Sequence, residues 1–214
     1  MNITSAVFSR SAADLAACPV DAVPEVAFVG RSNVGKSSLV NLLTRNAGLA
    51  RASATPGHTK LINFFTVNGT WRLVDLPGYG FAEVARKDSA QFSRAVAGYL
   101  QGRENLLCLF ALIDSSLPPQ DIDVEFIEWL GSVSARFVLV FTKTDRSSPA
   151  TVQANVDAFL ARLSTTFEKM PATFTCSATQ RQGREELLQF IGSILPPEAK
   201  RPPVKQPPRR NTPW

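Results

Sequence analysis

Cysteine is scarce in this chain, and the placement of the few cysteines argues against two classes of protein. Among 214 residues only Cys18, Cys108 and Cys176 occur, an odd number that is widely spaced. They form no CxxC pair, so neither a disulfide framework nor a zinc site is indicated. A reducing cytosol suits this pattern, and we expect a cytoplasmic protein.

Long apolar runs are also missing. No stretch approaches the ~20 consecutive apolar residues that a helix needs to cross a bilayer. Leu15-Ala16-Ala17-Cys18 resembles a bacterial lipoprotein cleavage site, but Arg10 and Asp14 interrupt the apolar stretch that a secretory signal requires. We therefore expect no membrane insertion, and we read residues 1–22 as an N-terminal segment that packs on the surface of the domain.

The positive charge of the chain is concentrated at its C-terminal end. From Pro196 onward five basic residues stand against one acidic residue, a net +4 out of a total of +5. Seven prolines in the same stretch exclude a helix or a central strand. We expect one folded domain at 23–195 and a disordered, Pro-rich basic tail at 196–214. That tail is either a solubilising end, which its composition favours, or a contact for phosphates.

Strand and helix patterns alternate along the domain, which predicts the fold class. Asn68-Gly69 between two apolar runs is a strong hairpin signal. The pattern predicts an α/β domain with a doubly wound, mostly parallel sheet, helices on both faces and a ligand at the carboxyl ends of the strands. The predicted strands are Val26–Val29, Leu61–Val67, Trp71–Val74, Leu106–Ile113, Phe137–Phe141 and Thr173–Cys176, and the predicted helices are Ser37–Leu43, Ser89–Leu100, Asp123–Leu130, Ala150–Leu163 and Glu185–Ile194.

A complete phosphate-binding loop follows the first predicted strand. Gly30 and Gly35 let successive N–H groups point at phosphate oxygens, and the helix N-terminus favours negative charge. Lys36 is predicted to reach the β- and γ-phosphates and to act in catalysis, and Ser37 to bind magnesium. The predicted nucleotide contacts here are Gly30, Arg31, Ser32, Asn33, Val34, Gly35, Lys36, Ser37 and Ser38.

A second motif, Asp75-Leu76-Pro77-Gly78, ends a later strand; all four residues are predicted nucleotide contacts, and Asp75 and Gly78 are also predicted to act in catalysis. Asp75 is predicted to contact the bound magnesium ion, either directly or through a water molecule of its coordination shell. Gly78 is predicted to bring its backbone N–H to the γ-phosphate, an approach that a side chain would obstruct. A Pro-Gly turn after a strand is a purely structural interpretation of the same residues, and it is compatible with the predicted role in nucleotide binding.

A third and a fourth motif point to guanine rather than adenine. The carboxylate of Asp145 can accept hydrogen bonds from the guanine N1–H and its exocyclic amine, a donor pair that adenine lacks. The stem of Lys143 can cover the base and the backbone of Ala178 can donate to the guanine O6, while Ser177 supports that loop. The predicted contacts are Thr142, Lys143, Thr144, Asp145, Cys176, Ser177 and Ala178.

The loop between the first helix and the hairpin has the position of a nucleotide-sensing switch. Thr59 is the candidate for the second protein ligand of magnesium and for a catalytic role, ordered when the γ-phosphate is present. His58, the only histidine, is either a general base or a solvent-exposed loop residue, and we favour the second reading. The predicted contacts in this loop are Gly57, His58, Thr59, Lys60 and Leu61.

Four motifs in this order predict a Ras-like P-loop GTPase that hydrolyses GTP slowly by itself. Ras-like switches place a glutamine just after the glycine of the second motif to orient water, and here that position is Tyr79. Asn33 either helps to coordinate a potassium ion beside the phosphates or only caps the loop.

These residues resemble one family, the bacterial EngB-type (YihA/YsxC) GTPases of large-subunit ribosome assembly. The resemblance runs from about Val23 to Leu195, and its most family-specific parts are Gly78-Tyr79-Gly80 and the threonine form of the Thr142–Asp145 motif. It implies GTP and magnesium binding, with Ser37 and Thr59 as metal ligands. Ser115-Ser116 and His58 stand where more basic residues are common in the family, and the tail is not part of the family pattern.

The resemblance also implies a role in late assembly of the large ribosomal subunit, with defective division and septation on depletion. The expected partners are GTP, GDP and a large-subunit precursor with its rRNA, and we expect a monomer. A GTP-binding regulatory or scaffolding module of the division machinery, with incidental hydrolysis, is the alternative.

Overall fold

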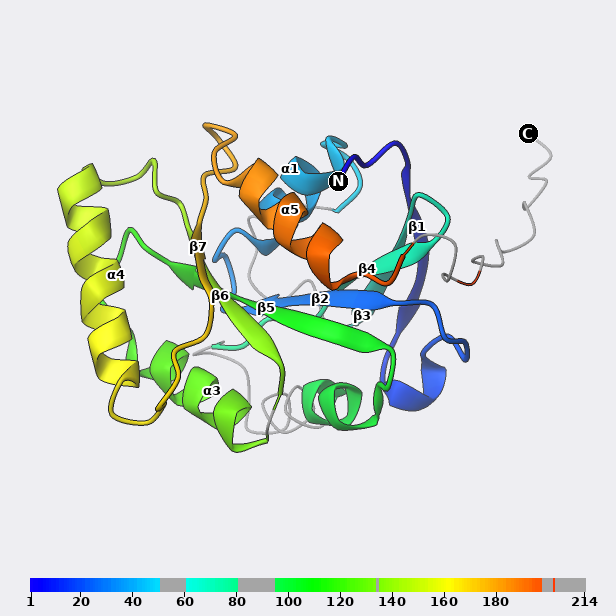
Figure 1. Cartoon of the computed structure of the whole chain (residues 1–214), viewed down its shortest axis with the longest axis horizontal. Coiled ribbons are helices and arrows are strands. Elements are labelled where there is room, and N and C mark those ends of the chain that lie inside the picture. Colours follow the sequence, from blue (N-terminus) through cyan, green and yellow to red (C-terminus); the bar gives the residue numbers. More distant parts are fainter. Residues whose placement is uncertain (51–60, 81–94, 134, 198–201, 203–214) are drawn as a thin grey trace.

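The computed structural model describes residues 1–50, 61–80, 95–133, 135–197 and 202 (Figure 1). One seven-stranded sheet forms its centre, in the order β1-β3-β4-β2-β5-β6-β7. β2, β4, β5, β6 and β7 run parallel, whereas β1 and β4 each pair antiparallel with β3. The strands are β1 (Ala6–Ala12), β2 (Glu25–Gly30), β3 (Ile62–Val67), β4 (Trp71–Asp75), β5 (Leu106–Asp114), β6 (Phe137–Thr142) and β7 (Thr173–Thr175).

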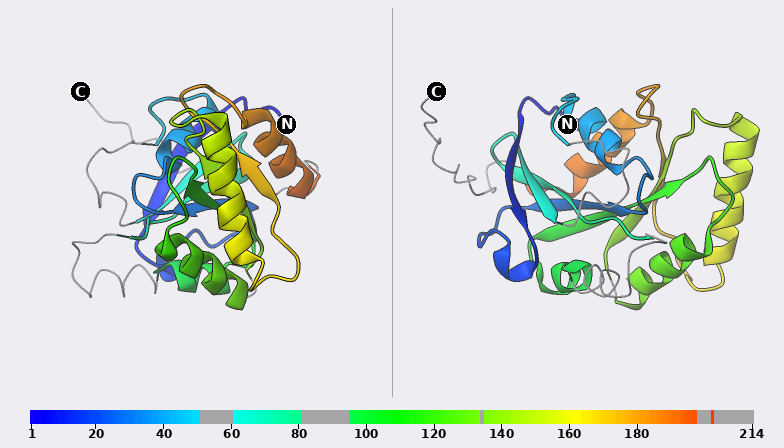
Figure 2. Two further views of the ribbon diagram at one scale, coloured as in Figure 1. Left: turned by 90° about the vertical axis from the view of Figure 1, so that its left-hand side faces the viewer. Right: turned by 180° about the vertical axis from the view of Figure 1, so that it is seen from behind.

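Helices cover both faces of this sheet, as the sequence predicts (Figure 2). The side chains of β2 alternate between two hydrophobic clusters, because successive residues of a strand point to opposite faces. Val26 and Phe28 pack with α1 and α5, and Ala27 and Val29 pack with α3 and α4. The helices are α1 (Lys36–Thr44), α3 (Asp121–Ser132), α4 (Pro149–Leu163) and α5 (Arg184–Ile194); Leu15–Ala17 is a 3-10 turn, and residues 95–102 are helical.

The predicted elements within the described residues lie close to the observed ones. The hairpin between β3 and β4 turns at Asn68 and Gly69, whose φ angles are both positive at 49° and 67°. Two positive φ angles belong to the type I′ turn, which matches the twist of the flanking strands. Of the predicted helix Ser89–Leu100, residues 89–94 lie outside the described residues.

The first strand, β1, was not predicted. It pairs antiparallel with β3 at the edge of the sheet, and Val7 and Phe8 are more than half exposed. Because its burial pattern lacks a clear alternation, periodicity alone does not reveal it. Residues 6–12, which precede β2 in the sequence, thus belong to the same sheet as the rest of the domain.

A buried charge network sits at the amino end of β2, away from the phosphate loop. Glu25 is fully buried and accepts hydrogen bonds from Tyr99, Arg103 and Arg72. Arg72 also makes two hydrogen bonds to Asp21, at 2.6 and 2.5 Å. A buried carboxylate is tolerated when it is paired and hydrogen-bonded in this way.

Within the described residues no helix is both long and apolar enough to span a membrane.

Candidate functional site

The predicted phosphate loop lies between the end of β2 and the start of α1. Gly35, with a φ of 105°, precedes the first residue of α1, so the loop enters the helix through a conformation that residues with side chains rarely adopt. Val34 is buried, whereas Asn33 is exposed and has a φ of 63°. Asparagine tolerates this left-handed region better than most residues. The loop is therefore shaped for backbone contact with a ligand at the N-terminus of a helix.

Two predicted catalytic residues meet beside this loop. The ammonium of Lys36 hydrogen-bonds to the carboxylate of Asp75, and both side chains are almost fully buried. Lys36 begins α1 and Asp75 ends β4, two elements far apart in the sequence. A buried cation and a buried anion at the carboxyl edge of a sheet are suited to a phosphate and to a divalent cation, respectively.

Gly78 lies directly against the phosphate loop. A Cβ placed on it would lie 3.1 Å from the carbonyl oxygen of Gly30 and 3.4 Å from the backbone nitrogen of Ser32. Nearby, Leu76 donates its N–H to Phe28 over 2.9 Å, which aligns this motif with the end of β2. The second motif and the phosphate loop are thus in backbone contact, and a side chain at position 78 would push them apart.

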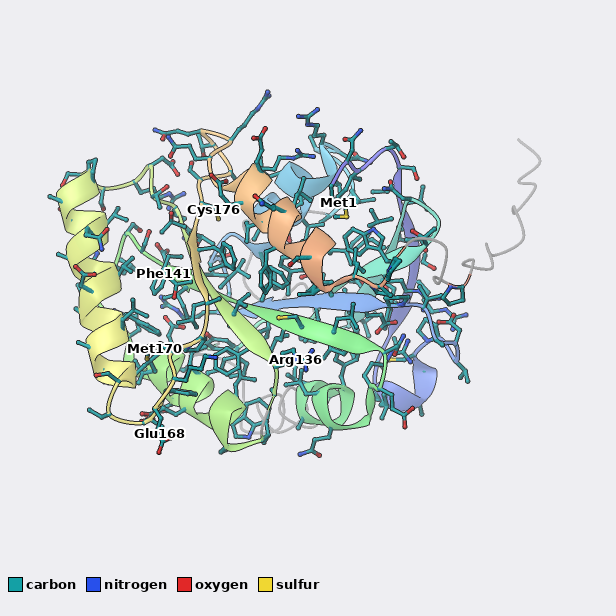
Figure 3. The ribbon with its side chains drawn as sticks, viewed as in Figure 1. Met1, Arg136, Phe141, Glu168, Met170 and Cys176 are labelled. Atoms are coloured by element: carbon teal, nitrogen blue, oxygen red, sulfur yellow. The ribbon has the colours of Figure 1, made fainter. Side chains whose placement is uncertain are left out.

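The third and fourth motifs meet at the neighbouring edge, at the ends of β6 and β7. Ser177 donates its hydroxyl to Oδ1 of Asp145 over 2.6 Å, and this hydrogen bond lowers the pKa of Asp145. Cys176 donates its N–H to Phe141 over 2.8 Å, and Figure 3 labels both residues. The carboxylate that is predicted to read guanine is therefore ionised at neutral pH and anchored to the loop that carries Ala178.

Thr142 joins the two halves of the site. Its hydroxyl is buried and donates to the carbonyl oxygen of Val34 over 2.6 Å, with Ile113 as a further acceptor at 3.2 Å. A single side chain thus links the predicted base-reading motif to the phosphate loop. That contact fixes the distance between the two regions that would hold opposite ends of a nucleotide.

Asp114 belongs to the site, although we did not predict it. Its Oδ2 lies 2.5 Å from the ammonium of Lys143, and its Oδ1 accepts from the hydroxyl of Ser116 over 2.6 Å. Burial opposes the charge of Asp114, but its hydrogen bonds to Lys143 and Ser116 keep its pKa below the ordinary value. The available signal was a carboxylate at the carboxyl end of an apolar strand, next to the strand that carries Lys143.

Most of the predicted contact residues line the carboxyl edge of the central strands. The exceptions are Gly57, His58, Thr59 and Lys60, which lie outside the described residues. Leu61, at the end of that loop, is described and exposed. Within the described residues, Ser37 and Asp75 are the candidate magnesium ligands.

These residues fit magnesium chemically. Mg²⁺ takes hard oxygen ligands and is usually held by one or two protein groups together with phosphates and waters. Ser37 supplies a hydroxyl in the first turn of α1, and Asp75 supplies a buried carboxylate at the end of β4. The arrangement can bind a nucleotide with its phosphates on the Gly30–Ser38 loop and its base against Asp145.

Comparison with known protein families agrees with this geometry. Residues 25–143 match the family model described as "50S ribosome-binding GTPase". A probable GTP-binding protein EngB of Bacteroides fragilis is 48% identical over 194 residues, which cover 91% of this chain and 96% of that protein. The protein of the same description from Christiangramia forsetii is 43% identical and is covered to 98%.

Solved structures share the fold at lower sequence identity. A crystal structure of a probable GTP-binding protein EngB aligns with a TM-score of 0.63 and 23% identity, covering 79% of this chain and 97% of that one. The structure of Era in complex with MgGDPNP and a segment of 16S ribosomal RNA aligns with a TM-score of 0.61 and 22% identity, over 81% of this chain and 57% of that one. At these identities the likeness supports the fold alone.

Proposed function

The chain belongs to the EngB family of GTPases, and from this premise we propose that it is a nucleotide-dependent switch in the assembly of the large ribosomal subunit. In its GTP form it docks on a large-subunit precursor and its rRNA, and hydrolysis to GDP releases it. The observation that carries this proposal is the match of residues 25–143 to the 50S ribosome-binding GTPase model, which includes the Lys36–Asp75 pair.

Lys36 and Gly78 bind the phosphates. The ammonium of Lys36 exchanges its contact with Asp75 for the β- and γ-phosphates, because the triphosphate as a whole carries more negative charge than one carboxylate. The backbone N–H of Gly78 donates to the γ-phosphate. GDP lacks that phosphate, so Gly78 and the loop that carries Thr59 distinguish the two nucleotides.

The hydroxyls of Ser37 and Thr59 would hold magnesium, with Asp75 contacting the bound ion directly or through water, and the ion would neutralise charge on the phosphate oxygens. Lys36 and Gly78 stabilise the charge that develops on the γ-phosphate through preorganised donors. Within the described residues, Asp75 is paired with Lys36, so the Asp75 carboxylate becomes available to the cation shell when Lys36 moves to the phosphates.

Selection of guanine rests on Asp145. Its ionised carboxylate accepts from the N1–H and the exocyclic amine, while the Lys143 stem lies over the base. Asp114 supports this role because it holds the Lys143 ammonium at 2.5 Å. Adenine would leave the Asp145 carboxylate without its donors in a partly buried site, which disfavours ATP.

The test is depletion of the protein in its host, followed by separation of ribosomal particles on a sucrose gradient. We expect large-subunit precursors to accumulate and mature 50S particles to decline before septation fails. Normal particles alongside a septation defect would contradict the proposal and favour a regulatory or scaffolding role in the division machinery.

A further inference from the structure

Tyr79, which directly follows Gly78, is tied to the phosphate loop through its backbone. Its N–H donates to the carbonyl oxygen of Gly30 over 3.3 Å, and its own carbonyl accepts from the N–H of Ser32 over 3.0 Å. Tyr79 and Arg31 form an isolated parallel bridge outside the named strands. The chain after β4 therefore runs beside the phosphate loop as far as Tyr79.

The ring of Tyr79 packs against α3. It is only 6% exposed and is stacked on Phe126, with ring centroids 4.3 Å apart and an interplanar angle of 28°. Phe126 in turn contacts Trp129, at a centroid distance of 5.6 Å. Asp123, Phe126 and Trp129 follow one another at intervals of three residues and so share one face of α3. The ring of Tyr79 is therefore held against α3.

The hydroxyl of Tyr79 lies close enough to the buried carboxylate of Asp123, in α3, for each group to shift the pKa of the other. Asp123 is only 2% exposed, and its burial raises its pKa, opposed by the guanidinium of Arg31 and by the Tyr79 hydroxyl. Nε of Arg31 lies 3.5 Å from Oδ2 of Asp123. Arg31 belongs to the phosphate loop. Asp123 therefore lies beside both segments of the chain that meet at the bridge between Arg31 and Tyr79.

The chain on the far side of Tyr79 is equally confined. Gly80 has a φ of 83°, and a Cβ on it would lie 2.8 Å from Cγ of Arg31 and 3.4 Å from Cδ1 of Ile122. Gly78 is pressed against the phosphate loop in the same way. Two glycines thus permit a close backbone approach on either side of one anchored aromatic side chain.

We propose that Tyr79, Asp123 and Arg31 form a latch that positions the N–H of Gly78 against the phosphate loop and couples the presence of the γ-phosphate to α3. Tyr79 is a positioning residue: it holds Gly78 and does not touch the reacting atoms. This inference rests on the proposed contact between Gly78 and the γ-phosphate. A donor that is held in place before binding needs no further ordering when the phosphate arrives, so loss of the latch weakens GTP binding more than GDP binding.

The test measures the affinities of GDP and of a non-hydrolysable GTP analogue, with the turnover rate, in three variants. Tyr79→Phe keeps the stacked ring and removes the hydroxyl, and Asp123→Asn removes the carboxylate charge. Asp121→Asn is the matched control, because Asp121 lies in the same helical turn but is 82% exposed and paired with Arg162.

We expect Tyr79→Phe and Asp123→Asn each to weaken binding of the GTP analogue about tenfold, the order of one polar contact with a buried charged group, and to leave GDP affinity within about twofold. The double variant should be little worse than either single one, because both remove the same contact. Asp121→Asn should match the unchanged protein in both affinities.

Equal weakening of GDP and GTP in Tyr79→Phe, or no change in either, overturns the latch. Gly78→Ala separates this failure from a failure of the proposed function. If Gly78→Ala weakens the GTP analogue selectively while Tyr79→Phe does not, only the latch is wrong. If Gly78→Ala leaves the preference for GTP over GDP unchanged, the assigned role of Gly78 is wrong and the latch with it.

Discussion

The hydroxyl of Ser177 donates to Oδ1 of Asp145 over 2.6 Å and thereby joins the two loops that are proposed to hold guanine. The same hydroxyl accepts from the backbone N–H of Gln180 over 2.9 Å. Ser177 itself is fully buried. One buried serine therefore orients the Asp145 carboxylate through Oδ1.

Replacement of Asp145 by Asn should change base preference. An amide offers a donor where the carboxylate accepts, so Asp145→Asn should bind GTP at least about a hundredfold more weakly and shift preference toward xanthine nucleotides, whose exocyclic oxygen needs a donor. Competition binding with GTP and xanthosine triphosphate measures this. A variant that retains its GTP affinity would show that Asp145 does not read the base.

Removal of the Ser177 hydroxyl should weaken guanine nucleotides without changing base preference. Ser177→Ala leaves Asp145 charged but unanchored, so we expect GDP and GTP affinities to fall about fivefold and by the same factor. Ser193→Ala is the control, because Ser193 is exposed on α5 and donates its hydroxyl to the carbonyl oxygen of Phe190 in its own helix. A selective loss of GTP alone would contradict a role at the base.

Unaided hydrolysis should be slow. The ring of Tyr79 is stacked on Phe126 and has no amide to align a water, so no side chain at that position replaces the glutamine of Ras-like switches. We expect 50S particles to accelerate turnover, and potassium to do so where sodium does not, if Asn33 helps to place a cation beside the phosphates. Rates in potassium and sodium, with and without 50S particles, test both parts. Fast hydrolysis by the isolated protein in either salt would contradict this mechanism.

The basic tail should be dispensable for nucleotide binding. A chain truncated after Leu195 keeps all the described residues of the site, so its GTP and GDP affinities should be unchanged. If the five basic residues contact rRNA, truncation should lower 50S affinity and reduce the salt dependence of binding. Unchanged affinity across a salt series would show that the tail only solubilises the protein.

The sequence predicted the local elements well because each has a local cause. Asn68-Gly69 supplies the positive φ angles of its turn, and Ser148 followed by Pro149 starts α4 with a side-chain cap on Thr151. The phosphate loop combines a strand end with a helix start within a few residues. Such signals can be read without knowing what lies across the fold.

Residues whose roles depend on distant neighbours were not predicted. Asp123 reads as an ordinary acidic residue in the first turn of a helix, and its importance follows from Arg31, which is far away in the sequence. Asp114 depends in the same way on Lys143, and β1 on its pairing with β3. Periodicity and motif spacing carry no information on which surfaces meet, so contacts of this kind become visible with the tertiary structure.

The central claim is that binding to the large-subunit precursor depends on the bound nucleotide. Its most direct measurement is co-sedimentation of the full chain with large-subunit precursors in the presence of GDP or a non-hydrolysable GTP analogue. Asp145→Asn serves as the internal control, tested with the GTP analogue and with the corresponding xanthine analogue. We predict that the unchanged protein sediments with the particles only with the GTP analogue, and that Asp145→Asn does so only with the xanthine analogue. Equal sedimentation with GDP and with the GTP analogue would contradict the account.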